Sequence, residues 1–153
     1  MMQSAQISTP AAATGNALVT QVLRDFGDRI LAVQPTCDGM PTFWVDRKDI
    51  KALLKSLRDH STPRFEMLFD VTGIDERVRV HRDGQPAAEF TVVYHLMSFS
   101  GNSDVRVKVP LQDADLKLPT VIDLWPSANW YERETWDMFG IEFEGHPNLY
   151  RIV

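Results

Sequence analysis

The chain has 153 residues, of which 44% are hydrophobic and 24% charged, a size and mixture that suit one globular domain with a real core. Its net charge of -5 argues against a nucleic-acid binder, because neutralising phosphates requires a basic face. The single Cys37 excludes an internal disulfide and an iron–sulfur cluster held by this protein alone. No apolar run approaches the roughly 20 residues that cross a bilayer, so we expect a cytoplasmic protein without direct membrane insertion.

The amino-terminal third begins with a tail and continues into a helix and two strands. Residues 1–15 are small and polar, and they are predicted to be a disordered tail ahead of a domain over 16–153. Asn16 can cap a helix that ends at Gly27, since apolar residues recur there at helical spacing: Leu18, Val19, Val22, Leu23 and Phe26. Two short strands, Ile30–Val33 and Thr42–Val45, are expected next.

A second helix is predicted to begin after Asp46, which can cap it. One face is apolar and the other basic, as in a surface helix over a core: Ile50, Leu53, Leu54 and Leu57 against Lys48, Lys51, Lys55 and Arg58. Beyond Pro63 the pattern changes to strands, with segments expected at 67–71, 77–80 and 90–97 and a turn at Asp83–Gly84.

The later strands differ in how many faces they bury. Residues 91–97 are apolar on both faces, which predicts an interior strand covered on both sides. Val105, Val107 and Val109 alternate with polar residues, which predicts a strand with one wet face. The order of elements therefore predicts a single α+β domain, with helices packed on a mixed or antiparallel sheet.

Two helices are expected near the carboxyl end. Thr120 can cap the first, which Pro126 would stop, and Ser127 can cap the second, which would end near Gly140. This last helix carries an unusual density of ionic and aromatic residues, in the run Trp130-Tyr131-Glu132-Arg133-Glu134-Thr135-Trp136-Asp137-Met138-Phe139-Gly140-Ile141.

At about 100° per residue, the ionic residues of this helix gather on one side. Trp130, Arg133, Glu134 and Asp137 fall together, while the opposite side holds Tyr131, Trp136, Met138 and Phe139. Ion pairs on an exposed helix contribute only about 0.3–0.5 kcal/mol, too little to explain the pattern. A second protein that covers these charges is the better explanation.

Glu132 is the outlier, because the projection places it on the apolar side, where a carboxylate needs a partner. Three interpretations stay open: an internal salt bridge to Arg77 or Arg79, a contact with a basic residue or backbone amide of a neighbouring subunit, and a proton-handling role. His146, between Gly145 and Pro147, is expected to be a hydrogen-bonded turn residue rather than a metal ligand.

The run from Trp130, continued by Phe143 and Gly145-His146-Pro147, closely resembles the signature of the C-type subunit of bacterial proton-pumping NADH:quinone oxidoreductase, respiratory complex I. The resemblance extends over roughly Asn16 to Val153 and is nearest to the form fused ahead of a D-type subunit. Two departures stand out. The family's Leu-Arg-Arg-Ile reads Leu149-Tyr150-Arg151-Ile152 here, and relatives continue beyond Val153, so a truncated carboxyl end is expected.

The resemblance implies a non-catalytic assembly subunit of the hydrophilic arm, peripheral on the cytoplasmic face of the bacterial inner membrane. Its partners would be the quinone-site (D-type) subunit and the cluster-bearing subunit beside it. FMN and the iron–sulfur clusters would belong to partner subunits, and this protein would hold no cofactor, metal or catalytic residue. The residues expected to contact partners are Trp130, Glu132, Arg133, Glu134, Asp137, His146, Pro147 and Arg151.

Two alternatives remain beside this interpretation. The equivalent subunit of a related membrane-bound hydrogenase or plastid-type dehydrogenase would carry the same module. A stand-alone hydrolase with Glu132 and Glu134 as acid and base is disfavoured, because residues two apart on a helix point in nearly opposite directions.

Overall fold

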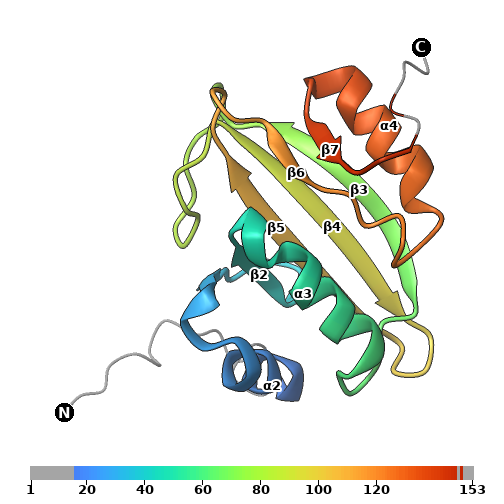
Figure 1. The fold of residues 1–153 in the computed structure, drawn as a ribbon. Helices are drawn as coiled ribbons and strands as arrows, with labels where there is room; N and C mark the ends of the chain where they lie inside the picture. Colours follow the sequence, from blue (N-terminus) through green and yellow to red (C-terminus); the bar gives the residue numbers. More distant parts are fainter. Residues whose placement is uncertain (1–15, 148, 150–153) are drawn as a thin grey trace.

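The main sheet has five strands in the spatial order β1-β2-β5-β4-β3 (Figure 1). The structure, a computed structural model, describes residues 16–147 and residue 149. The strands are β1 Ile30–Val33, β2 Thr42–Val45, β3 Met67–Asp75, β4 Phe90–Ser98 and β5 Ser103–Leu111. Neighbours run antiparallel except β2 and β5, which are parallel. The sheet is therefore mixed, and β4 lies inside it as predicted, but the described helices cover only one of its faces and not both.

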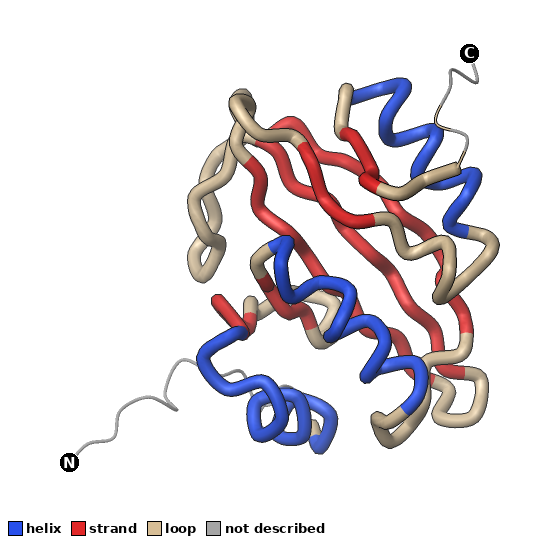
Figure 2. The backbone as a smooth tube through the Cα atoms, viewed as in Figure 1, coloured by secondary structure: helices blue, strands red, loops and turns tan. Residues whose placement is uncertain are grey.

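The described helices lie on one face of this sheet (Figures 1 and 2). Helix α2, Ala17–Phe26, runs into a short 3₁₀ turn, η2, Gly27–Arg29, and α3, Arg47–Asp59, lies over the sheet. Helix α4, Ala128–Phe139, packs on β3. Beside α4, β6 Lys117–Pro119 and β7 Glu142–Glu144 form a small parallel pair. The predicted α+β class is confirmed.

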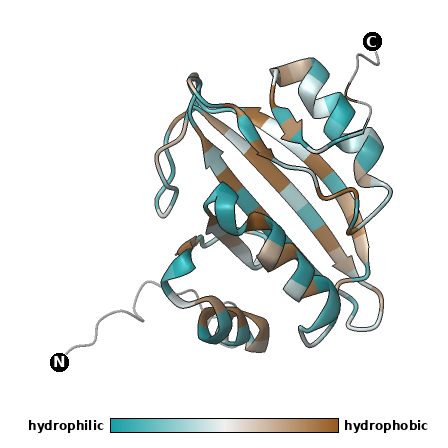
Figure 3. Cartoon of the chain, viewed as in Figure 1, coloured by the Kyte–Doolittle hydropathy of each residue, from teal (hydrophilic) through white to brown (hydrophobic). Residues whose placement is uncertain are grey.

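The strand register separates a core face from an open face. One row across four strands is fully buried under the helices: Val71, Tyr94, Val107 and Phe43. The next row faces the other way: Thr72, Val93, Lys108 and Trp44. Side chains alternate along a strand, so moving by one residue exchanges the two faces. Figure 3 accordingly shows hydrophobic and hydrophilic bands following one another along the strands.

The helix ends agree with the predicted caps in all but one case. The side chains of Asn16 and Asp46 accept hydrogen bonds from the amides two residues on, at 2.8 and 3.0 Å. Gly140 ends α4 in the left-handed region, with φ of 73°. The predicted cap at Ser127 is wrong, because its side chain makes no capping hydrogen bond and its backbone is already helical.

The strand predicted over residues 77–80 is absent. β3 instead continues through Gly73 to Asp75, whose carboxylate then binds the backbone and guanidinium of Arg77 at 2.8–3.0 Å. Val78 and Val80 alternate with arginines, but each valine is 87% exposed and packs against no sheet. Residues 76–89 form a loop, and this loop lies over the open face of the sheet, which none of the described helices covers.

The helix predicted from Thr120 to Pro126 is also wrong. Only one turn forms there, with the amide of Trp125 donating to the carbonyl of Val121 at 3.1 Å. Thr120 does cap this turn weakly, since its Oγ1 accepts from the amide of Ile122 at 3.2 Å. Its hydroxyl proton, however, goes to a different element, and Pro126 stops the helix before a second turn can form.

Gly73 is a point of close approach between β3 and α4. A methyl group placed there would lie 2.7 Å from Cδ2 of Phe139, inside van der Waals contact. We predict that Gly73→Ala lowers the free energy of unfolding by about 1–3 kcal/mol, because overpacking must displace the ring or the helix. Urea denaturation followed by circular dichroism measures this.

A matched control is Thr72→Ala, whose side chain points to the other face of the sheet. If the Phe139 contact causes the loss, adding Phe139→Ala to Gly73→Ala should cost less than the two single changes together. Additive losses would show that the glycine matters for a reason other than this contact.

Candidate functional site

Helix α4 turns one line of side chains inward and another outward. Ala128, Glu132 and Thr135 are buried against the sheet. Trp130, Glu134 and Met138, which recur every four residues, form what we call the outward stripe; Trp130 is 53% and Met138 68% exposed. Large apolar side chains in solvent, next to a charge, are the composition of a protein contact surface.

The outward stripe corrects one part of the helical projection. Met138 was predicted on the apolar side with Phe139, but only Phe139 reaches the sheet. The inward line passes through Glu132 and Thr135, both polar, and Tyr131 and Phe139 of the predicted apolar side pack against the core beside it. Phe139 packs directly over Gly73 of β3.

The Glu132 carboxylate is fully buried and held by two donors from one short segment. Oε1 accepts from the hydroxyl of Thr120 at 2.5 Å, and Oε2 from the amide of Val121 at 2.8 Å. The amide of Thr120 in turn donates to the carbonyl of Glu144 in β7 at 2.9 Å. Glu132 therefore connects α4 to the segment after β6, which is itself bonded to β7.

Of the interpretations left open for Glu132, the structure supports an internal partner. The partner is a hydroxyl and a backbone amide, however, and not an arginine. Arg77 pairs with Asp75 at 2.8 Å, and Arg79 lies 3.8 Å from Glu76. Because Glu132 has no exposed surface within its own protein, it is not positioned to touch a partner as the sequence prediction had it.

Burial has a measurable effect on the ionisation of Glu132. Loss of water raises the pKa of this carboxyl to about 7, and the hydrogen bonds from Thr120 and Val121 only partly oppose the rise. The pKa of Tyr94 is also raised, first by burial and then by the negative charge of Glu132. The core under α4 thus contains an acid that changes charge near neutral pH.

The segment after β7 returns to the start of α4. His146 lies with Nε2 3.2 Å from the carbonyl oxygen of Asn129, and its amide donates to Phe143 at 3.1 Å, so it is the hydrogen-bonded turn residue that was predicted. Pro147 is exposed. This contact places the Gly-His-Pro turn next to the first turn of the helix.

The remaining predicted contact residues lie around the outward stripe. Arg133 and Asp137 are half-buried on its flank, and the guanidinium carbon of Arg133 lies 5.7 Å from the centre of the Trp130 ring. Glu134 is exposed while Glu132 is buried, so the two carboxylates of the hydrolase hypothesis do not face one substrate. Arg151 and the predicted tail 1–15 lie outside the described residues.

Within residues 16–147 and 149, no cluster of three His, Cys, Asp or Glu side chains is arranged to hold a metal ion. No helix among these residues has the length and apolar character needed to span a membrane.

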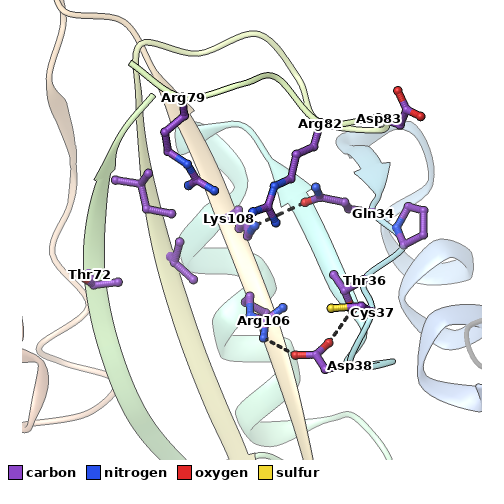
Figure 4. A pocket seen from close by; sticks show the side chains of 13 residues that line it. Gln34, Thr36, Cys37, Asp38, Thr72, Arg79, Arg82, Asp83, Arg106 and Lys108 are labelled. Atoms are coloured by element: carbon purple, nitrogen blue, oxygen red, sulfur yellow. Dashed lines mark hydrogen bonds and ion pairs between the residues drawn. The ribbon is translucent and has the colours of Figure 1, made fainter. Parts of the chain in front are cut away.

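The sequence analysis missed a groove of about 620 Å³ on the open face of the sheet (Figure 4). Arg79 and Arg82 reach into it from the 76–89 loop, and Arg106 and Lys108 rise from β5. The alternation in β5 predicted a wet face, but nothing local indicated that the loop would fold back over it.

Comparison with known proteins identifies a family for the protein. Residues 43–153 match the family model described as Respiratory-chain NADH dehydrogenase, 30 Kd subunit. Relatives named as the C/D subunit of NADH-quinone oxidoreductase include that of Acidiphilium cryptum, 53% identical over 95% of this chain and 25% of the relative. That of Acinetobacter baylyi is 53% identical over 90% of this chain and 23% of the relative. The chain spans about a quarter of the length of these curated relatives.

Two solved structures share the fold. Nqo5 of a trypsin-resistant fragment aligns with a TM-score of 0.70 and 33% identity, over 86% of this chain and 98% of that one. A polypeptide of the membrane-bound sulfane sulfur reductase, an archaeal respiratory membrane complex, aligns with a TM-score of 0.68 and 25% identity, over 87% and 72%.

The raised pKa of Glu132 predicts that the fold loses stability as the pH rises. The folded protein binds this proton more tightly than the unfolded one, whose pKa is near 4.5. Its contribution is therefore complete below pH 4.5 and is lost as the pH rises to about 7, by up to about 3 kcal/mol. Denaturant unfolding at several pH values should show that loss in the wild type and a flatter profile in Glu132→Gln. Parallel profiles would mean that Glu132 titrates normally.

The hydrogen bonds of Glu132 predict a separate effect of truncation. At pH 5, where the carboxyl is neutral, Glu132→Ala should lower the free energy of unfolding by about 2–4 kcal/mol, because it leaves a cavity and removes the acceptor of Thr120 and Val121. Glu134→Ala, two residues away and exposed, should change it by less than about 0.5 kcal/mol. Equal losses in the two variants would contradict the structural role of Glu132.

Proposed function

The chain belongs to the family of the respiratory-chain NADH dehydrogenase 30 kDa subunit, as its carboxy-terminal signature indicated, and on that premise we propose that it is a non-catalytic assembly module of proton-pumping NADH:quinone oxidoreductase. In this proposal it sits in the hydrophilic arm, on the cytoplasmic face of the bacterial inner membrane. FMN and the iron–sulfur clusters are held by partner subunits. Relatives named as the C/D subunit of that enzyme support the proposal.

The observation that carries the proposal is the outward stripe of α4. The inward side of the helix is tied down by Glu132 and by the Phe139–Gly73 contact, so the stripe is presented on a rigid support. A rigid surface loses little conformational entropy on binding, and tryptophan is prominent among residues that dominate protein interfaces. The arrangement suits a subunit that holds others in place.

The proposed partners are the D-type quinone-site subunit and the cluster-bearing subunit beside it. The name C/D of the relatives supports a D-type neighbour. Trp130 and Met138 would supply the apolar centre of the contact, with Glu134, Arg133 and Asp137 around it. His146 would bring the following segment to the same surface, since it is hydrogen-bonded to the first turn of α4.

A second candidate is the equivalent subunit of a related membrane-bound respiratory complex. The similarity to a polypeptide of the sulfane sulfur reductase favours it, because the same fold occurs there. That identity is 25%, however, against 53% for the NADH-quinone oxidoreductase relatives. The electron donor of the assembled complex distinguishes the two.

We predict that the tagged protein, expressed in its natural reading frame, recovers flavin and iron–sulfur subunits with NADH:quinone activity from detergent-solubilised membranes. Trp130→Ser combined with Met138→Ser should reduce that recovery by about tenfold or more, since each removes an exposed anchor of the contact. Its thermal midpoint should match the wild type, because both side chains are exposed.

The matched control is Leu23→Ser with Leu31→Ser, two exposed apolar residues on α2 and β1. It should be recovered with its partners as well as the wild type. Recovery of the wild-type protein alone would refute the assembly role. Full recovery of the Trp130/Met138 variant would refute the outward stripe as the contact.

A further inference from the structure

The groove on the open face, which we call the basic groove, is built across three strands. Its floor includes Thr72, Val93 and Lys108, which pair in one row across β3, β4 and β5. One wall is the 76–89 loop and the other is the segment 34–38 (Figure 4). Because α4 covers the opposite face of the sheet, the basic groove is separate from the outward stripe.

The basic groove concentrates positive charge on a protein whose net charge is -5. Two of its four cations have carboxylate neighbours inside the fold: Arg106 binds Asp38 at 2.8 Å, and Arg79 lies 3.8 Å from Glu76. The other two, Lys108 and Arg82, form no ion pair with the residues that the structure describes. The groove therefore has positive charge left for a ligand.

Lys108 is fixed in place by uncharged groups. Its ammonium lies 5.3 Å from the centre of the Trp44 ring and 3.4 Å from Oε1 of Gln34. Burial lowers the pKa of Lys108, repulsion from Arg106, Arg82 and Arg79 lowers it further, and attraction to Glu76 partly opposes the change. Figure 4 shows Arg79 and Arg82 directed from the loop toward the same space. An anion placed there would relieve this repulsion.

Part of the groove floor is apolar, and this decides between two kinds of anion. Ile74 and Val93 form the apolar part of the floor beside the cations. The rest of the lining includes the polar Thr72 and the acidic Asp38 and Asp83. A compact phosphate would contact the cations and leave the apolar floor uncovered. An extended peptide with acidic and apolar side chains in alternation would cover both. Residues 1–15 include no acid, so charge argues against the protein's own amino terminus as the occupant.

We propose that the basic groove docks an extended acidic segment of a partner protein, with carboxylates on Lys108 and Arg82 and apolar side chains on Ile74 and Val93. This inference rests on the proposed assembly role and deepens it, because it gives the module a second docking surface on the face away from α4. Arg106 contributes less direct contact, since Asp38 and Thr42 already engage its guanidinium.

The experiment is a titration of the full-length protein, labelled with ¹⁵N, with a capped octapeptide rich in glutamate and containing leucine. The parallel probes are inorganic pyrophosphate and the same peptide with lysine in place of glutamate. Amide shifts map the site, and Trp44 fluorescence follows occupancy beside Lys108. We expect shifts along β4, β5 and the 76–89 loop, little binding of the lysine peptide, and pyrophosphate binding about tenfold weaker than the acidic peptide.

Lys108→Gln combined with Arg82→Gln should weaken acidic-peptide binding by about a hundredfold at low salt. The control with the same change in net charge is Arg24→Gln with Lys55→Gln, two exposed cations on α2 and α3; its binding should stay within about twofold of the wild type. Unchanged melting temperatures would show that both variants fold.

Several results would overturn the inference. They are shifts outside the groove, equal loss in the control variant, pyrophosphate binding as tight as the peptide, or self-association of the protein abolished by the groove variant. The titration needs no other subunit, so the two proposals can fail separately. If the peptide does not bind but the pull-down recovers the partner subunits, the docking role of the basic groove is refuted and the assembly role stands. If the peptide binds but the pull-down recovers no partner subunits, the assembly role is refuted and the protein that supplies the acidic segment is no longer identified.

Discussion

The buried Glu132 carboxylate is the interaction on which the carboxy-terminal half depends. It joins α4 to Thr120 and Val121, and Thr120 is bonded to β7, so helix, turn and small sheet are held through one side chain. A carboxylate in this position is costly to ionise, which is why burial moves its pKa to about 7. Two hydrogen bonds partly offset this ionisation cost, because each carboxylate oxygen accepts from a donor on one of two adjacent residues of the same turn.

This connection has a consequence for the surface. The angle of α4 is set from inside, by Glu132 on one side and by the missing side chain of Gly73 under Phe139 on the other. Trp130 and Met138 are then exposed because the inward arc is already occupied, although both are large and apolar. The outward stripe is therefore a product of core packing and does not require a partner to hold its shape.

The sheet divides the molecule into two surfaces of different chemistry. One face is fully buried beneath helices, and the other carries a lysine and an arginine from β5 under an irregular loop. These cations gather on a protein that is acidic as a whole. A local positive field on a negative protein steers acidic groups toward one place and repels them elsewhere, which favours a single binding orientation.

The amino-acid sequence by itself determined the features that depend on near neighbours, and the tertiary structure alone decided which distant groups meet. The caps at Asn16 and Asp46 need only a backbone amide two residues further along the chain. The valines of β5 are buried because they recur at every second residue of a strand. Even the burial of Glu132 followed from its place on the helix, and the family signature could be recognised because the motif is continuous in sequence.

Thr120, by contrast, lies 12 residues from Glu132, and Gln34 lies 74 residues from Lys108, so no local pattern could assign either partner. Residues 77–80 did not form the predicted strand and residues 120–126 did not form the predicted helix, because local preferences are weak and tertiary context overrides them. Hydrogen bonding and periodicity act over a few residues, whereas strand register brings remote side chains together, and only folding sets that register.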